Sequence, residues 1–345
     1  MLFLLLGILL VATAVLDALW TTLALKSAGP IAGRIAGRLW LVMRFAHGRW
    51  AMHRLLSFAG PIIVVATLVT WLLMMWLGWA LIFVSDPRSV VGLQTGEPGG
   101  WLMQLYFVGF TITTLGVGDV VPTGAWRIAT VLAAASGLVV ITLAVTYFAP
   151  VVNAVMAGRR LSTFVASMGR SPQQLLINAW ADEDLRGLDS YLASVTEMIN
   201  AHTHVHRGYP IIHYYHSRDP RAAVPLRLAV LDEAVSLMRF AVRPEARPHP
   251  MTLHVLEAAT SGYLRALRKV YIVPAGEAPP IPDLEPLRDA GIPLVPNDEI
   301  EKAYEMLAPR RRLLRGLVEH DGWRWSDVPL AEHEAWDASG AETEE

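Results

Sequence analysis

Three long apolar runs constrain the fold of this chain more than any other feature. Residues 3–25 contain a single charged residue, Asp17, and residues 61–85 and 128–156 contain none. A helix rises about 1.5 Å per residue, so each run can cross the roughly 30 Å of hydrocarbon in a bilayer. Only 17% of the chain is charged, against about a quarter in soluble proteins. We therefore predict three membrane-spanning helices, the first over residues 1–26.

The charged residues between the runs predict the orientation in the membrane. The link between the first two runs carries six basic residues and no acidic one: Lys26, Arg34, Arg38, Arg44, Arg49 and Arg54. Basic loops stay in the cytoplasm. We expect a multi-pass protein of the plasma or inner membrane, with its N-terminus outside and residues 157–345 in the cytoplasm. A cleaved signal peptide is disfavoured, because the first run is long and has no positive residues before it.

The link over residues 27–60 has two features of its own. Gly29, Gly33 and Gly37 are four residues apart, which fits either a small-residue stripe on a packed helix or a flexible connection. The following aromatic residues alternate with arginines, as in a helix that lies among lipid headgroups. We therefore expect an interfacial segment with membrane lipid as a partner.

A polar turn interrupts the apolar sequence between the second and third runs. The stretch "FTITTLGVGDVVPTG" covers residues 110–124, and the apolar segment before it, residues 101–113, is too short to cross a bilayer. The turn follows from the outer side, so we expect a short helix that enters the membrane and a chain that returns through the turn. Non-helical backbone survives at that depth only inside protein or along a water-filled cavity. This combination indicates a pore.

Glycines at alternate positions make the backbone of the turn suitable for binding a dehydrated cation. Gly116 and Gly118 alternate with Leu115 and Val117. Glycine adopts positive φ without a Cβ clash, which lets successive carbonyls face one axis. Thr114 adds a hydroxyl at the inner end. One chain supplies one wall of such a site, so several copies must surround the axis.

The stretch "TTLGVGDVVP" resembles the signature of the potassium channel family, whose filter reads T-V-G-Y-G-D. The resemblance covers residues 61–156 and implies an outer helix over 61–85, a pore helix over 101–113, a filter over 114–119 and an inner helix over 126–156. It also implies a homotetramer that conducts K⁺ passively and is not an enzyme. The K⁺ ligands it implies are carbonyls of Thr114, Leu115, Gly116 and Val117, with Gly118 completing the filter. The supporting residues it implies are Tyr106, Phe107, Thr111, Thr113 and Asp119.

Two departures from the family pattern affect selectivity. Val117 stands where the family usually has tyrosine, so the carbonyl is kept and an aromatic support is lost. We expect K⁺ selectivity with weaker discrimination against Na⁺; a weakly selective cation channel is the alternative. Phe110 replaces a carboxylate of some relatives, which leaves Asp119 to pair with Trp101, Tyr106 or water. A membrane-anchored signalling or scaffold protein with a vestigial pore is a further alternative.

The inner helix contains candidates for a hinge and a gate. Gly137 lies in its middle and serves either as a hinge or for close packing. Pro150 removes a backbone hydrogen bond near the cytoplasmic end. We expect a gate around Thr146, Tyr147 and Pro150, with Ile141 and Val145 lining the cavity. No ladder of arginines occurs in a spanning run, so direct voltage sensing is not expected.

Ionisable residues outside the filter have both structural and functional interpretations. Asp17 either pairs with Thr21, Thr22 or a basic residue of the link, or acts as a proton or gating sensor. His202 and His206 are four residues apart and would share a helix face. They are expected to be ordinary surface or interface histidines, with a metal site or a pH sensor as alternatives.

The remaining residues, 157–345, predict an all-α cytoplasmic domain. Ser171, Pro172 and Gln174 form a helix-start signal. Apolar positions repeat at helical spacing after residues 224, 253 and 298. No phosphate loop, dinucleotide motif or catalytic constellation occurs. We expect no cofactor apart from the permeant K⁺ and no nucleic-acid partner, and the ligand of the domain stays open.

Overall fold

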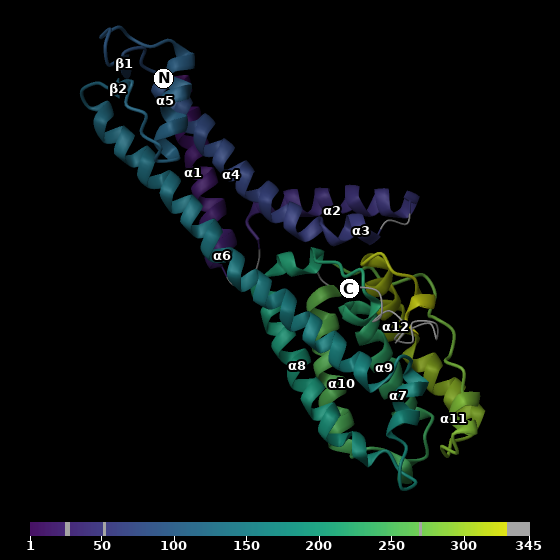
Figure 1. The fold of residues 1–345 in the computed structure, drawn as a ribbon. Coiled ribbons are helices and arrows are strands. Elements are labelled where there is room, and N and C mark those ends of the chain that lie inside the picture. Colours follow the sequence, from purple (N-terminus) through teal and green to yellow (C-terminus); the bar gives the residue numbers. More distant parts are fainter. Residues whose placement is uncertain (25–27, 51–52, 269–270, 330–345) are drawn as a thin grey trace, which may run out of the picture. The chain divides into compact units, whose positions relative to one another are not determined.

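The computed structural model describes residues 1–24, 28–50, 53–268 and 271–329, and the chain forms two compact units. Unit 1 comprises residues 1–43, 58–153 and 208–214. Unit 2 comprises residues 44–57, 154–207 and the chain from residue 215 onward. Each unit therefore combines segments that are far apart in the sequence, as the colours in Figure 1 show.

Three helices of the described chain are long and apolar enough to cross a membrane. They are α1 (Leu2–Leu23), α4 (Ala59–Val84) and α6 (Trp126–Met168). The inner helix was expected to end at residue 156, but α6 continues without a break through Pro150 to Met168 and so extends from unit 1 into unit 2. The predominance of helices confirms the predicted all-α membrane fold.

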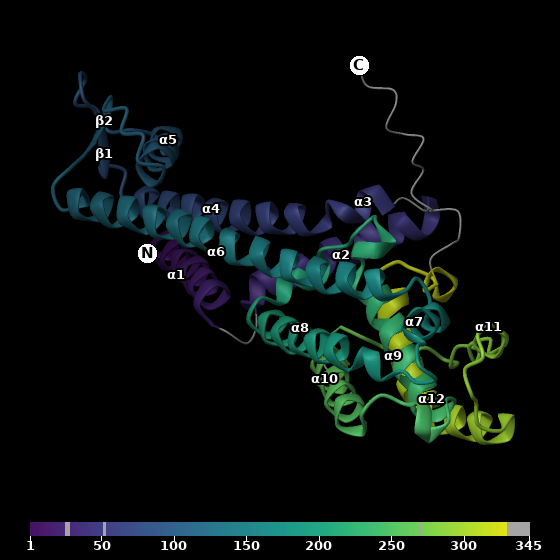
Figure 2. The same cartoon turned by 60° about the horizontal axis from the view of Figure 1, so that its bottom comes forward.

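Unit 1 also contains a short helix and a small sheet at one end of α4. Helix α5 (Trp101–Ile112) agrees closely with the expected short helix. Strands β1 (Val90–Gly92) and β2 (Val120–Pro122) pair antiparallel, with Val91 opposite Val121. The sequence analysis did not predict these strands, which lie beside α5 in Figures 1 and 2. They bring the chain before α5 next to the chain that follows the polar turn.

Helix α1 packs along α4 within unit 1 (Figure 1). Ala14 and Ala18 are fully buried and share a hydrophobic core with Trp71 and Met75 of α4. Asp17 lies on the same face of α1 and is also buried, with 3% of its surface exposed. A charged side chain in this position requires hydrogen-bond donors.

The donors for Asp17 come from the start of the link and from α4, which corrects the expected pairing. Its two carboxylate oxygens accept the backbone N–H groups of Ile31 (2.8 Å) and Ala32 (3.1 Å), and Oδ2 also accepts Trp71 Nε1 at 2.8 Å. The Thr21 hydroxyl instead accepts the N–H of Gly29. Asp17 therefore satisfies the first turn of α2 (Pro30–Trp50), where backbone N–H groups have no partner inside the helix.

The link itself is helical where it is described. After α2 comes the short α3 (His53–Ser57). Gly33 and Gly37 lie inside α2, so a flexible connection is wrong for this stretch. Of the predicted small-residue stripe, only Gly29 packs closely, against Asp17 of α1, whereas Gly33 and Gly37 have no close neighbour in another part of the described chain.

Unit 2 is a helical assembly around α9 (Val224–Phe240), in which every residue from Leu226 to Met238 is buried. The other helices are α7 (Pro172–Ala179), α8 (Asp189–Gly208), α10 (Pro250–Arg268), α11 (Glu285–Asp289) and α12 (Asn297–His320); Figure 2 shows α7, α10 and α12 around α9. The short 3₁₀ turns described in this unit are η1 (Arg186–Leu188), η3 (Pro220–Ala222), η4 (Pro244–Ala246) and η5 (Trp325–Asp327), whereas η2 (Pro210–Tyr214) belongs to unit 1.

Unit 2 contains a capped helix start at α7 and buried ion pairs between α9 and α12. The Ser171 hydroxyl accepts the Gln174 N–H at 3.1 Å, as the helix-start signal predicted. Asp232 and Glu233 of α9 pair with Arg310 and Arg311 of α12. Buried charges need such partners, because an isolated charge in the core is costly.

Candidate ion-binding turn

The turn after α5 has an alternating backbone. Thr114, Gly116 and Gly118 have positive φ values of 57°, 59° and 84°. The two glycines were expected to adopt this conformation. Thr114 was not, and a β-branched residue rarely does so. Leu115 and Val117 lie between them with 72% and 50% of their surfaces exposed in the single chain.

The N–H groups at the start of the turn are bonded to the end of α5. The carbonyl of Phe110 accepts the N–H of Leu115 at 2.8 Å and that of Gly116 at 3.4 Å, and the carbonyl of Thr111 accepts Thr114 N–H at 3.0 Å. In a planar trans peptide the C=O points opposite to the N–H of the next residue. The carbonyls of Thr114 and Leu115 therefore point away from α5.

These carbonyls are available to a ligand. Within the described parts of the chain, no backbone N–H donates to a carbonyl of residues 114–118. All five residues are also exposed in the single chain. Five consecutive exposed carbonyls without a backbone donor in the described chain can accept a donor, a cation or water.

Gln104 anchors α5 to the end of α4. It is 2% exposed, and its Nε2 donates to the carbonyls of Phe83 (3.2 Å) and Asp86 (3.0 Å) and to Ser89 Oγ (3.0 Å). Trp76 adds a bond from Nε1 to the carbonyl of Leu105 at 2.9 Å. Gln104 was not among the residues predicted for the site. A lone amide in the apolar stretch "WLMQLYFVGF" was the available signal.

The residue after the turn is held by the sheet and by α5. The carbonyl of Asp119 accepts the N–H of Leu93 at 2.9 Å, and its carboxylate pairs with the hydroxyl of Tyr106. Tyr106 was one of the three partners expected for Asp119. The Tyr106 ring in turn lies edge-on to Phe110, with ring centroids 5.2 Å apart.

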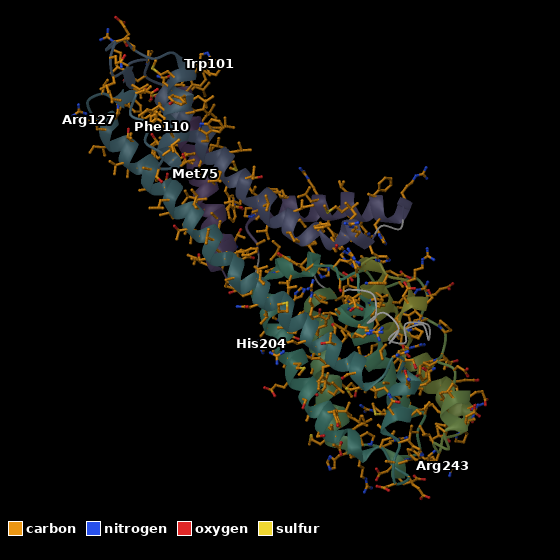
Figure 3. All side chains as sticks on the ribbon, viewed as in Figure 1. Met75, Trp101, Phe110, Arg127, His204 and Arg243 are labelled. Carbon is orange, nitrogen blue, oxygen red and sulfur yellow. The ribbon has the colours of Figure 1, made fainter. Side chains whose placement is uncertain are left out.

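A chain of aromatic rings supports the other side of α5. Phe107 lies 5.2 Å from Phe110 and 5.3 Å from Phe83, and Phe83 lies 5.1 Å from Trp126 at the start of α6, measured between ring centroids. Figure 3 shows Trp101 at the start of α5 and Phe110 nearer the turn. The aromatic side chains thus brace α5 itself, and the short Val117 side chain takes no part among the described ring contacts.

Asp86 joins the end of α4 to the start of α6. Its Oδ2 accepts Trp126 Nε1 at 2.8 Å and its Oδ1 accepts the N–H of Arg88 at 2.9 Å. The backbone N–H of Arg88, followed by the Trp126 indole, lowers the pKa of Asp86 below its usual value. The carboxylate therefore stays ionised and keeps both helices connected near the turn.

The inner-helix candidates occupy different surroundings. A Cβ on Gly137 would collide with the backbone of Ile112, so this glycine permits close packing of α6 on the end of α5; the hinge stays a prediction. Thr146 is exposed and bonds the carbonyl of Thr142. Tyr147 lies 5.7 Å from Tyr209, between ring centroids. Among the cavity candidates, Val145 is exposed and Ile141 is half-buried.

The two candidate histidines are buried in unit 2, so a surface position for them is wrong. His202 and His206 are 6% and 5% exposed, with their rings near Tyr263. Burial lowers the pKa of His202 to about 4 and that of His206, beside His202, to about 3. The part of the chain that the structure describes contains no group of three His, Cys, Asp or Glu side chains that could hold a metal ion.

Comparison with known proteins agrees with this arrangement. A family profile described as "Ion channel" matches residues 66–154, which include α5, the turn and much of α4 and α6. The uncharacterized membrane protein YdjJ of Bacillus subtilis (strain 168) is 36% identical over 323 residues, covering 92% of this chain and 94% of its own. No solved structure matches the chain. The chain therefore belongs to one family with this membrane protein and contains a domain of the ion-channel family over residues 66–154.

Proposed function

We propose that four copies of this chain form a K⁺-selective channel in the plasma or inner membrane, through which ions pass passively between the carbonyls of residues 114–118. The observation that carries the proposal is the run of open carbonyls in a backbone with alternating positive φ. A dehydrated K⁺ needs oxygen ligands that replace its water shell, and rings of carbonyls supply them.

A single turn covers only one side of an ion, which supports the homotetramer. The exposed side chains of Leu115 and Val117 and the exposed apolar positions of α6, such as Val131, offer surfaces to lipid or to neighbouring copies. One filter sequence per chain favours four chains over two. The positive-inside rule supports an external N-terminus and a cytoplasmic unit 2.

Val117 affects the degree of selectivity. Its carbonyl is a potential ligand, while its side chain provides no aromatic bracing for the turn. In this proposal the position of the oxygens depends on hydrogen bonds to the end of α5, chiefly those accepted by Phe110. We therefore expect K⁺ to be preferred over Na⁺, but by less than in a filter with tyrosine at this position.

The test is the reversal potential of the purified protein in a planar bilayer between K⁺ and Na⁺ solutions. A K⁺-selective pore gives a potential close to the K⁺ equilibrium value, whereas equal permeability would assign the chain to weakly selective cation channels. Liposome flux tests the pore itself. Gly116→Asp should abolish it, and Gly96→Asp is the matched control, because Gly96 also has positive φ (64°) in an exposed, open turn. Absence of any flux from the folded protein would favour the membrane-anchored scaffold.

A further inference from the structure

A second set of histidines lies at one junction inside unit 2. His47 from α2, His53 from α3 and His216 from the segment before η3 meet the end of α12 at Asp321, the residue that follows the last turn of that helix. His216 and Asp321 are 2% and 7% exposed, and His47 is 8% exposed. We call Asp321, His216 and His53 the histidine relay.

With both rings neutral, the hydrogen bonds of the relay have one arrangement. An ionised carboxylate only accepts, so His216 donates from Nδ1 to Asp321 Oδ2 at 3.2 Å. The neutral His216 ring then has a bare Nε2. His53 donates from its Nδ1 to that nitrogen at 3.1 Å. Each ring thus depends on the protonation state of the next, over a sequence separation of 163 residues between His53 and His216.

Further contacts fasten the link to the end of α12. His47 Nε2 lies 3.1 Å from the carbonyl of Gly322, and its Nδ1 is buried without a hydrogen-bond partner in the described chain. The His53 ring stacks on Trp323 at 4.3 Å and meets the His47 ring edge-on at 4.5 Å, between centroids. The end of α2 and α3 therefore contact the chain at the end of α12 through imidazole rings and the buried Leu56.

The charges around the relay make it sensitive to acid. The other ionisable side chains that act on this region are Arg44 from α2, His320 from α12, Asp327 from η5 and Tyr263 from α10. At neutral pH the two carboxylates outweigh the single guanidinium. Protonation of His53 and His320 would add two positive charges to the small volume that already holds the Arg44 guanidinium, and like charges at such distances repel.

A hydrogen bond between the two rings also requires that at least one of them is neutral and supplies a lone pair. With both His53 and His216 protonated, an N–H would point at an N–H in place of a lone pair. Burial, followed by the neighbouring His216 and His47, lowers the pKa of His53, and burial beside Arg44 lowers that of His320 to about 4. The attached state therefore binds fewer protons than the released state, and its stability falls as the pH drops below about 6.5.

We propose that the histidine relay is an acid-sensitive latch, which holds α3 and the end of α2 on the end of α12 at neutral pH and releases them on acidification. Helix α2 continues without interruption from this junction into unit 1. The proposal does not depend on ion conduction, and its test measures the junction alone.

The test is a distance measurement in the full-length protein in lipid nanodiscs. The chain contains no cysteine, so Arg54→Cys and Ser326→Cys place two spin labels on exposed positions of α3 and η5. Pulsed electron resonance should give one short distance at pH 7.5 and mainly longer distances at about pH 5. If release is accompanied by the binding of one proton, the ratio of released to attached protein rises by up to tenfold for each pH unit of acidification.

Substitutions separate the relay from general acid unfolding. His53→Asn keeps a donor near the Nδ1 position but cannot titrate. It should therefore reduce the pH dependence of the ratio of released to attached protein by up to tenfold per pH unit. His254→Asn, at an exposed position on α10, should leave it unchanged. If His53→Asn fails to fold, the wild-type titration still decides, because an unchanged distance from pH 7.5 to about pH 5 overturns the latch. A distance that lengthens with a chelator at pH 7.5 and recovers with Zn²⁺ would assign the imidazoles to a metal and also overturn it.

Discussion

Acidification should destabilise unit 2 through the two histidines buried on α8. His202 lies against Gly158 of α6 and Tyr263 of α10, and its Nδ1 has no hydrogen-bond partner among the described residues. Burial disfavours the charged ring, so the folded pKa is about 4 for His202 and about 3 for His206. An unfolded histidine titrates near 6.5.

The sign and size of the effect follow from these values. Between pH 6.5 and the folded values, the unfolded chain binds protons that the folded chain excludes, so stability falls as the pH falls. At pH 5 the difference amounts to about 2 kcal/mol for each histidine and about 4 kcal/mol together. Domains have a free energy of unfolding of only about 5–15 kcal/mol. Unit 2 should therefore lose a large part of its free energy of unfolding at pH 5.

The assay is urea unfolding of the detergent-solubilised protein at pH 7 and pH 5, followed by circular dichroism. The variants His202→Gln and His206→Gln should each reduce the pH-dependent loss by about 2 kcal/mol, whatever their effect at pH 7. His204→Gln is the matched control, because His204 lies between them on α8 and points to the outer side (Figure 3). An equal loss in the wild type and in both buried variants would refute the reasoning.

Three further substitutions test the supports of unit 1. Asp17→Ala leaves three donors without an acceptor and should destabilise the protein by at least about 1–3 kcal/mol in thermal unfolding, whereas Thr13→Ala, at a half-buried position of α1 whose hydroxyl bond is exposed, should change little. Gln104→Leu removes the three hydrogen bonds of Nε2, although the carbonyls of Phe83 and Asp86 keep their bonds from Ser89; a loss of about 1 kcal/mol is expected, and unchanged melting would contradict the anchoring role of Gln104. Gly137→Leu forces α6 away from Ile112 and should cost about 1–3 kcal/mol or more, measured by melting in detergent.

Local features were readable from the sequence because their causes are local. The apolar runs predicted the spanning helices from composition, and the Ser171 signal predicted the start of α7. Positive φ at Gly116 and Gly118 followed from the need to turn without a Cβ. In each case the decisive residues lie within a few positions of one another.

Features that depend on distant partners could not be predicted. Strands of three residues, such as β1, are too short to produce a recognisable alternation. The acceptors of Gln104 lie on a preceding segment whose course the sequence does not give. The pairing of His216 with Asp321 spans 105 residues, and the extension of α6 to Met168 passes through a proline and a basic pair that usually suggest a helix end.

The hydrogen bonds of Asp17 also bear on the order in which the chain enters the membrane. A carboxylate in hydrocarbon is expensive until it finds donors. Two of its three donors belong to residues 31 and 32, which the ribosome adds soon after α1, and the third belongs to Trp71, which comes much later. The newly made α1 can therefore be satisfied by its own following segment, and α4 joins a helix that no longer carries an unpaired charge.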